Sequence, residues 1–456
     1  MKKFLSCLCM LAVALTLIPF NVSAASAPNI LAESAILFAE SDDGTYSSVL
    51  YEKNADQRMY PASLVKIMTA VVALDKQPDL DAEFLVYKAS LDPLTAIGEV
   101  KYFMPGEKMA FRNMLDLLLV PSYNEAADVI AYNIAGSIED FVNLMNSKAE
   151  DLGMTGTRFT NAHGLHDDNQ YTTARDLLIL CQYAMKIDAF AEIVSKVTIT
   201  TPITNKHSKE YTLSSTNHLL HNRSQPGYVY EGALGIKTGT TTPAGNCLAA
   251  AYKKDGMTYY SVVLKSAKTE SGRDGRFVDT RALFDHAQKN FSVQTLLKAT
   301  QPIVEVPVTL SSDGTSIILL PEKSLSDLIS NSFDYATDVV FEHQLEEGAD
   351  TTGKVVLSYT APQTIQAPVE KGQAIGTLRV TFEGRVYEMA LLSSSTLTKS
   401  EMLNTVDSVQ NIFESRTFKI IIIVIVALIV IMVTIMISLS RRSKKRNRYG
   451  RGKYSR

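Results

Sequence analysis

Two short runs of hydrophobic residues bounded by polar ones mark the first regular stretch of the chain. They lie in residues 34–40 and 47–53, on either side of a polar segment containing Asp43 and Gly44, which predicts a two-stranded β-hairpin. From Ser63 to about Met154, hydrophobic residues instead recur every three or four positions, the period of a helix. The clearest helical segments are 111–120, 124–136 and 138–153.

Strand patterns return later in the chain, at 232–239, 246–254 and 258–267. Asp255 and Gly256 separate the last two, and this dipeptide favours a tight hairpin turn. A helix is predicted from about Phe277 to Lys289. We expect the early hairpin to join these later strands in one sheet packed by helices, which gives an α/β domain over residues 28–295.

The pattern changes to short alternating runs after about Ala299, separated by turn-forming residues such as Ser312-Asp313-Gly314 and Glu383-Gly384. The runs are 303–310, 315–320, 354–359, 377–382 and 385–392. They predict a separate, small all-β domain over residues 300–395. Residues 396–418 are polar with scattered hydrophobic positions, which favours a helical stalk.

Both ends of the chain carry long hydrophobic segments. Residues 1–24 have two lysines, a hydrophobic run and small residues before Ala24, which is typical of a secretory signal peptide cleaved after Ala24. Residues 419–440 are long enough to cross a bilayer core of about 30 Å as a helix. The tail 441–456 has nine basic residues and no acidic one, which predicts a single-pass protein with a cytoplasmic tail and the rest outside the cell membrane.

Composition narrows the function classes. The chain has 456 residues, 46% of them hydrophobic, and a formal charge of −3. Since the tail holds nine basic residues, the remainder carries about −12, which argues against a nucleic-acid partner. The basic tail is instead a contact for anionic membrane lipids. After signal cleavage only Cys181 and Cys247 remain, and we expect buried thiols and no disulfide framework.

Lys66 is the first candidate for chemistry, because it lies among hydrophobic residues one helical turn after Ser63. The plain alternative is a surface lysine whose stem covers hydrophobic surface while its ammonium reaches water. Two further motifs bear on this choice. Ser122 and Asn124 stand two residues apart, and Lys237, Thr238 and Gly239 follow at the end of a strand.

Each of these motifs also has an ordinary structural explanation. Ser122 with Glu125 three residues later could form a helix capping box. The Lys237-Thr238-Gly239 run could be an exposed strand end.

Together and in this order, the motifs resemble S-x-x-K, S-x-N and K-T-G of the penicillin-binding proteins and serine β-lactamases. With the loop from Phe159 to Leu177, the chain resembles the D-alanyl-D-alanine carboxypeptidases among the low-molecular-mass penicillin-binding proteins over residues 28–400. The resemblance implies a β-lactamase/transpeptidase-like catalytic domain of the α/β (α+β) class with an antiparallel sheet and a helical subdomain. The small all-β domain and the single transmembrane helix would follow it.

The resemblance also implies an activity and its partners. The protein would be a serine peptidase that removes the terminal D-alanine from peptidoglycan stem peptides, be acylated by β-lactam antibiotics, and need no metal or organic cofactor. A serine hydroxyl needs a base, and lysine can serve only if its pKa is lowered by burial and a second ammonium. We expect Lys237 to supply that ammonium.

Site roles follow from the same resemblance. Ser63 is expected to be the nucleophile and Lys66 its base, while Ser122 relays a proton and Asn124 holds Lys66 and the substrate. On the third motif, Lys237, Thr238, Gly239 and Thr240 would bind substrate, with Thr238 on its terminal carboxylate. The backbone N–H groups of Ser63 and Thr240 would form the oxyanion hole. Arg276 is a further candidate cation for the carboxylate.

Four alternatives stay open. A class A β-lactamase needs a glutamate between the second and third motifs, and residues 158–176 have none. His163 and His166 could belong to a zinc peptidase, although Gly164 lies beside them and no H-E-x-x-H motif is present. The protein could also cleave cross-linked stems as an endopeptidase, or be a non-catalytic cell-wall scaffold.

Overall fold

The computed structural model describes residues 27–221 and 227–449, so the predicted signal peptide lies outside the described residues. The chain divides into two compact units. The first contains the described residues up to Gln294 together with Asp327–Phe333, and the second contains Thr295–Ser326 and the residues from Asp334 onward.

A five-stranded antiparallel sheet forms the centre of the first unit, in the order β2-β1-β9-β8-β7. Its strands are β1 (Ser34–Ser41), β2 (Ser47–Lys53), β7 (Ala233–Thr241), β8 (Gly245–Lys254) and β9 (Met257–Ser266). The predicted early hairpin and its pairing with the later strands are therefore confirmed. Asp255 and Gly256, between β8 and β9, both have positive φ, at 51° and 74°, as the predicted tight turn requires.

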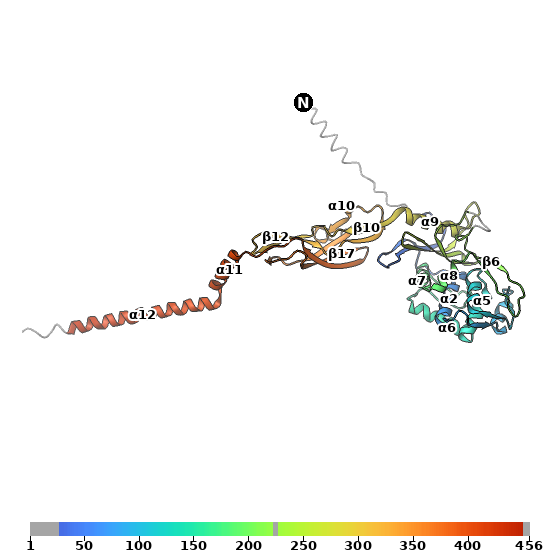
Figure 1. The fold of residues 1–456 in the computed structure, drawn as a ribbon, viewed down its shortest axis with the longest axis horizontal. Coiled ribbons are helices and arrows are strands. Elements are labelled where there is room, and N and C mark those ends of the chain that lie inside the picture. The colour runs from blue at the N-terminus through green and yellow to red at the C-terminus, as the bar shows by residue number, and fades with distance from the viewer. Residues whose placement is uncertain (1–26, 222–226, 450–456) are drawn as a thin grey trace, which may run out of the picture. The chain divides into compact units, whose positions relative to one another are not determined.

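Helices cover both faces of this sheet (Figure 1). One face packs against a group of helices through a core that includes Ile36 of β1 and Val262 of β9. The other face packs against α9 (Gly275–Asn290) through Leu37 and Val263, their neighbours along the same strands. Because successive strand residues point to opposite faces, a continuous hydrophobic run in each strand supplies both cores. The helices of the first group are α2 (Val65–Lys76), α4 (Phe111–Leu119), α5 (Asn124–Ala135), α6 (Ile138–Asp151), α7 (Ala174–Ala184) and α8 (Asp188–Val194).

The helical stretch predicted from Ser63 to Met154 is interrupted, and in this respect the prediction was wrong. A short strand pair, β3 (Glu83–Leu85) with β4 (Lys108–Ala110), lies inside it together with α3 (Lys88–Thr95). Three-residue strands are too short to produce a recognisable alternation. The remaining short elements are the 3-10 helix η1 (Ala62–Leu64), the pair β5 (Thr198–Thr200) and β6 (Thr212–Ser214), and the pair β10 (Phe291–Leu297) and β13 (Leu325–Ser330).

The second unit contains a seven-stranded sheet in the order β14-β15-β17-β18-β12-β11-β16. Each of the five predicted runs forms a strand of this sheet. The strands are β11 (Val304–Thr309), β12 (Ser316–Pro321), β14 (Val339–Phe341), β15 (Val355–Thr360), β16 (Ile365–Gln366), β17 (Ala374–Phe382) and β18 (Arg385–Ser393). Two short helices, α10 (Tyr335–Asp338) and η2 (Glu342–Gln344), flank β14.

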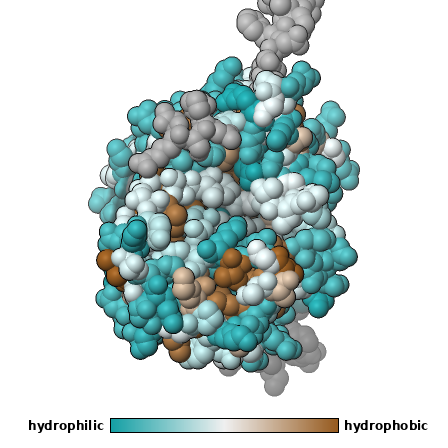
Figure 2. All heavy atoms as spheres, turned by 90° about the vertical axis from the view of Figure 1, so that its right-hand side faces the viewer, coloured by the Kyte–Doolittle hydropathy of each residue, from teal (hydrophilic) through white to brown (hydrophobic). Residues whose placement is uncertain are grey.

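Two helices end the described chain, α11 (Glu401–Glu414) and α12 (Arg416–Tyr449). Within α12, residues Arg416–Arg441 form a 26-residue stretch that is strongly hydrophobic over at least 18 residues and has no buried residue. This helix is long and hydrophobic enough to cross a membrane. In contrast to the hydrophobic surface of this helix, the face of the first unit shown in Figure 2 is mostly hydrophilic, with hydrophobic residues grouped in its lower half.

Candidate active site

The turn that carries Ser63 is enclosed by two glycines from other parts of the chain. A Cβ on Gly164 would lie 2.1 Å from the carbonyl oxygen of Ala62, and a Cβ on Gly239 would lie 3.0 Å from the backbone nitrogen of Ser63. A Cβ cannot approach a backbone as closely as 2.1 Å, so position 164 requires glycine, whereas a Cβ at position 239 would have to displace the turn by a few tenths of an ångström. Ala62 itself has a φ of 47°, in the left-handed region. The Ser63 turn is therefore fixed between the loop at Gly164 and strand β7.

Lys66 is fully buried, with no exposed surface, although it lies on the first turn of α2. Its Nζ lies 3.0 Å from Ser63 Oγ and 2.7 Å from Asn124 Oδ1, and it also contacts the backbone oxygen of His163. These three acceptors match the three N–H groups of an ammonium. The surface-lysine alternative required the ammonium to reach water and is therefore wrong.

Burial is the main cause of the altered acidity of Lys66 and lowers its pKa to about 7. The carboxyl groups of Asp128, Glu125 and Glu99 oppose this effect, and Lys101 adds to it. The pKa of Lys237 is lowered well below its usual value, again mainly by burial and then by repulsion from Lys66. Lys66 therefore has a neutral form available near pH 7, and desolvation, more than the expected second ammonium, is responsible.

Ser122 lies between α4 and α5 with a φ of 66°, a conformation that residues other than glycine rarely adopt. The N-cap of α5 is Tyr123, and no side chain caps this helix end. The capping-box explanation of Ser122 is therefore wrong. Such strained backbone is found preferentially at functional sites.

Asn124 connects Lys66 to the carboxylate of Glu99. Its Oδ1 accepts a hydrogen bond from Lys66 Nζ at 2.7 Å, and its Nδ2 donates to Glu99 Oε2 at 2.8 Å. The two bonds fix the orientation of the amide, since only Nδ2 can donate. The structure thus brings the first two motifs together.

The third motif lies on β7, which is an edge strand of the sheet. Lys237 is 1% exposed and donates from Nζ to the backbone oxygen of Thr238 at 3.0 Å. The hydroxyl of Thr238 is 2.6 Å from that of Thr216, whose backbone N–H donates to the oxygen of Val120 at 3.2 Å. Thr216 therefore joins the third motif to the segment that precedes Ser122. Thr240 follows on β7 and pairs with Asn246 of β8.

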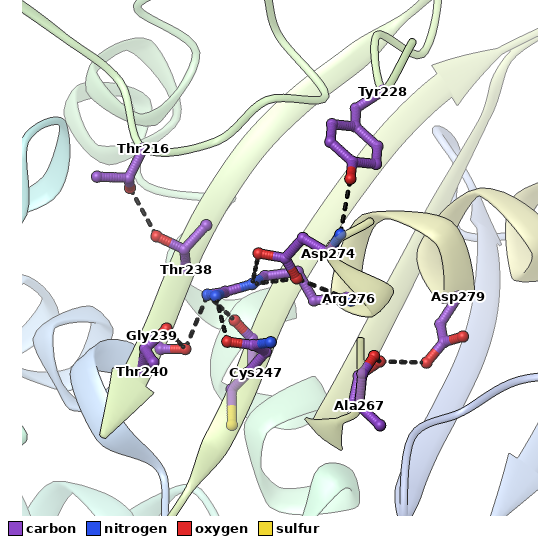
Figure 3. A network of polar contacts seen from close by, with 12 residues as sticks. Thr216, Tyr228, Thr238, Gly239, Thr240, Cys247, Ala267, Asp274, Arg276 and Asp279 are labelled. Atoms are coloured by element: carbon purple, nitrogen blue, oxygen red, sulfur yellow. Dashed lines mark hydrogen bonds and ion pairs between the residues drawn. The ribbon is translucent and has the colours of Figure 1, made fainter. Parts of the chain in front are cut away.

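Arg276 extends from α9 beneath β7 and β8 and is only 8% exposed (Figure 3). Its Nε donates to both carboxylate oxygens of Asp274 at 3.0 Å, and its Nη2 donates to Asn246 Oδ1 at 2.6 Å. Its Nη1 donates to the backbone oxygens of Gly239 at 2.9 Å and Cys247 at 3.3 Å. Protein groups thus use most of its donors.

Cys247 and Cys181 are both free and buried, as expected.

The two histidines of the zinc alternative face different partners. His166 Nε2 lies 3.1 Å from Asp168 Oδ1, whereas His163 Nε2 lies 4.0 Å from Asp128 Oδ2. Among residues 27–221 and 227–449, no group of three or more His, Cys, Asp or Glu side chains could hold a metal ion. The geometry of the described residues therefore does not support a zinc site at these histidines.

Sequence reasoning missed four residues of this site: Glu99, Asp128, Gly164 as a contact of the Ser63 turn, and Thr216. Asp128 could have been found, since it follows Asn124 by four residues and so shares its face of α5. Glu99 and Thr216 have no local signal, because each reaches the site from a distant segment.

Comparison with known proteins identifies a family from the sequence and related folds from the structure. The family described as D-alanyl-D-alanine carboxypeptidase matches residues 21–268. The chain is 29% identical to D-alanyl-D-alanine carboxypeptidase DacF of Bacillus subtilis, over 78% of this chain and 82% of that protein. It is 33% identical to a D-alanyl-D-alanine endopeptidase of Pseudomonas aeruginosa, over 48% of this chain and 66% of that one. Among solved structures, penicillin binding protein 5 of Haemophilus influenzae matches with a TM-score of 0.54 and 25% identity, over 82% of this chain and all of that one.

Proposed function

The chain belongs to the D-alanyl-D-alanine carboxypeptidase family, and from this premise we propose that Ser63 is the nucleophile of its reaction and Lys66 the base. The protein is a serine-type D-Ala-D-Ala carboxypeptidase that acts on peptidoglycan and binds β-lactams. The observation that carries the assignment is the 3.0 Å contact between Lys66 Nζ and Ser63 Oγ at a fully buried lysine.

Acylation begins when neutral Lys66 takes the proton of the Ser63 hydroxyl. The oxygen attacks the carbonyl carbon between the two D-alanines, and negative charge develops on the carbonyl oxygen. The backbone N–H groups of Ser63 and Thr240 stabilise that charge. The C–N bond then breaks, and Ser122 passes a proton to the departing D-alanine. Water later hydrolyses the ester on Ser63.

Substrate binding is assigned to β7. As an edge strand it offers backbone groups to which an extended peptide can add as a further strand. Gly239 gives such a peptide room beside the strand, and the hydroxyl of Thr238 binds the terminal carboxylate. Lys237 supplies positive charge beneath it. Arg276 holds the Gly239 carbonyl at 2.9 Å and so supports the strand, in addition to its proposed attraction for the carboxylate.

Membrane attachment completes the proposal. Residues 1–24 would direct export, residues 28–295 would form the catalytic domain, and 300–395 would form the all-β domain outside the membrane. After the stalk 396–418, residues 419–440 would span the bilayer once and leave the basic tail 441–456 in the cytoplasm. The hydrophobic stretch Arg416–Arg441 and the nine basic residues of the tail support this arrangement.

Release of free D-alanine from a D-Ala-D-Ala peptide, together with covalent labelling by a fluorescent penicillin, tests the proposal. Ser63→Ala should abolish both signals. Ser147→Ala, a change at an exposed serine of α6, should leave both unchanged. Labelling that survives in folded Ser63→Ala protein would disprove the assignment.

The same assays can include a cross-linked stem peptide. Cleavage of this substrate would add the endopeptidase activity for which a relative is named. A folded wild-type protein that labels with penicillin and yet releases no D-alanine would favour the scaffold alternative.

A further inference from the structure

Asp128 is a buried acid of the active site that the proposed mechanism does not use. It lies on α5, one turn after Asn124, and is 1% exposed. Its Oδ1 has no hydrogen-bond partner among the described residues. Its Oδ2 lies 4.0 Å from His163 Nε2. Burying a carboxylate without close partners costs free energy, so we expect a nearby cation to compensate its charge.

His163 does not supply that cation. Its Nδ1 accepts a hydrogen bond from the backbone N–H of Leu165 at 3.0 Å, which leaves the ring proton on Nε2, facing Asp128. Burial, with repulsion from Lys66, lowers the pKa of His163 to about 3, so the ring is neutral. The backbone oxygen of His163 also accepts a hydrogen bond from Lys66 Nζ. The ring and the carbonyl of this residue thus join Asp128 to the surroundings of Lys66.

Attraction between Lys66 and Asp128 acts on both groups. Burial raises the pKa of Asp128, and the positive charge of Lys66 opposes that rise, so the carboxylate and the ammonium stabilise each other. Among the carboxyl groups, Asp128 does most to raise the pKa of Lys66, ahead of Glu125 and Glu99.

The other charged groups around Lys66 have further partners. Glu125 accepts the backbone N–H groups of Lys101 and Tyr102 through Oε1, both at 3.0 Å. Glu99 accepts from Asn124 at 2.8 Å. Lys101, from the same segment as Glu99, and Lys237, from β7, are the facing cations. Asp128 is thus the carboxyl group most directly available to compensate the charge of Lys66.

We propose that Asp128 is a positioning residue that stabilises the ammonium formed when Lys66 takes the proton of Ser63, an inference that rests on the proposed function. In that step the O–H bond of Ser63 breaks and an N–H bond of Lys66 forms, while the oxygen electron pair attacks the substrate carbonyl. The positive charge remains buried beside the Asp128 carboxylate until the proton passes on to the leaving amine.

Removal of the Asp128 charge should therefore have two linked effects. Without the carboxylate, the pKa of Lys66 falls, so the neutral base is present at lower pH and acylation begins at lower pH. The same change makes Lys66 a weaker base, so the maximal rate falls. A residue with a purely structural role would lower the rate at every pH without moving the profile.

The experiment measures the second-order rate constant for acylation by a fluorescent penicillin from pH 5 to 10. The acid limb is the part of the pH profile in which the rate constant rises from its low value at acid pH. For Asp128→Asn, the midpoint of this limb should move down by about 1 pH unit or more, since an opposite charge nearby shifts a pKa by about 1–3 units. The plateau should fall about threefold to tenfold. Asp116→Asn is the matched control: Asp116 on α4 bonds to Lys196 at 2.8 Å, and its loss should leave the limb in place.

An acid limb unchanged in Asp128→Asn, at any plateau, would overturn the proposal. If this variant does not fold, Asp128→Glu and Asp128→Ala provide the same comparison, because glutamate keeps the charge and should keep the limb, whereas alanine should move it. Failure of the proposed function would appear differently, as penicillin labelling that persists in Ser63→Ala.

Discussion

Substitution of Gly239 by alanine would test whether the approach of β7 to the Ser63 turn sets the geometry of acylation. The added Cβ would lie 3.0 Å from the Ser63 nitrogen and 3.1 Å from both Ala62 Cβ and the Pro61 oxygen. Ordinary contacts begin at 3.4 Å, so the strand and the turn must separate by about 0.4 Å.

Neither backbone can move freely. β7 is paired with β8 along its length, and Arg276 holds the Gly239 oxygen at 2.9 Å. Gly164 contacts the turn through the Ala62 carbonyl. The displacement therefore falls on the nitrogen of Ser63, whose N–H group is assigned to the oxyanion hole. A misplacement of 1 Å in a catalytic group can cost about 100-fold in rate, so a displacement of about 0.4 Å should cost several-fold.

We expect Gly239→Ala to lower the acylation rate constant about threefold to tenfold, with a loss of stability of about 1–3 kcal/mol. Stopped-flow acylation by a fluorescent penicillin measures the rate, and thermal unfolding by circular dichroism shows that the protein is folded. Gly314→Ala in the second unit is the control, since its Cβ would meet Leu397 Cδ2 at an ordinary 3.4 Å. A folded Gly239→Ala protein that is acylated within twofold of the wild-type rate would refute this reasoning.

Three further predictions follow from the same site and chain. Wild-type acylation should rise with pH through about 7, because the neutral amine of Lys66 exists above its pKa, whereas folded Lys66→Arg should stay inactive from pH 6 to 10; a near-normal rate would contradict the base assignment. Thr238→Val should weaken discrimination between a free and an amidated substrate carboxylate more than it slows penicillin acylation, and equal losses would argue against carboxylate binding. A chain ending at Arg416 should be soluble and acylated at the full-length rate, and a folded but unreactive product would assign the anchor a catalytic role.

Local sequence determined much of this protein. Two short hydrophobic runs and the Asp255-Gly256 turn between them predicted the β8–β9 hairpin, because strand propensity and turn conformation depend on neighbouring residues. The spacing of Ser63 and Lys66 likewise placed both on one helical face, since three residues make nearly one turn. The three motifs thus predicted the candidate reactive side chains without tertiary information.

Tertiary structure decided how those side chains can act. The burial of Lys66, and with it the main cause of its lowered pKa, arises from packing against elements far away in the chain. Its contact with the His163 oxygen joins positions 97 residues apart, and Glu99 reaches Asn124 from 25 residues away. Arg276 was recognisable as a cation, yet its partners on β7 and β8 depend on how α9 packs on the sheet. Contacts and desolvation of this kind depend on the path of the whole chain, which local periodicity does not encode.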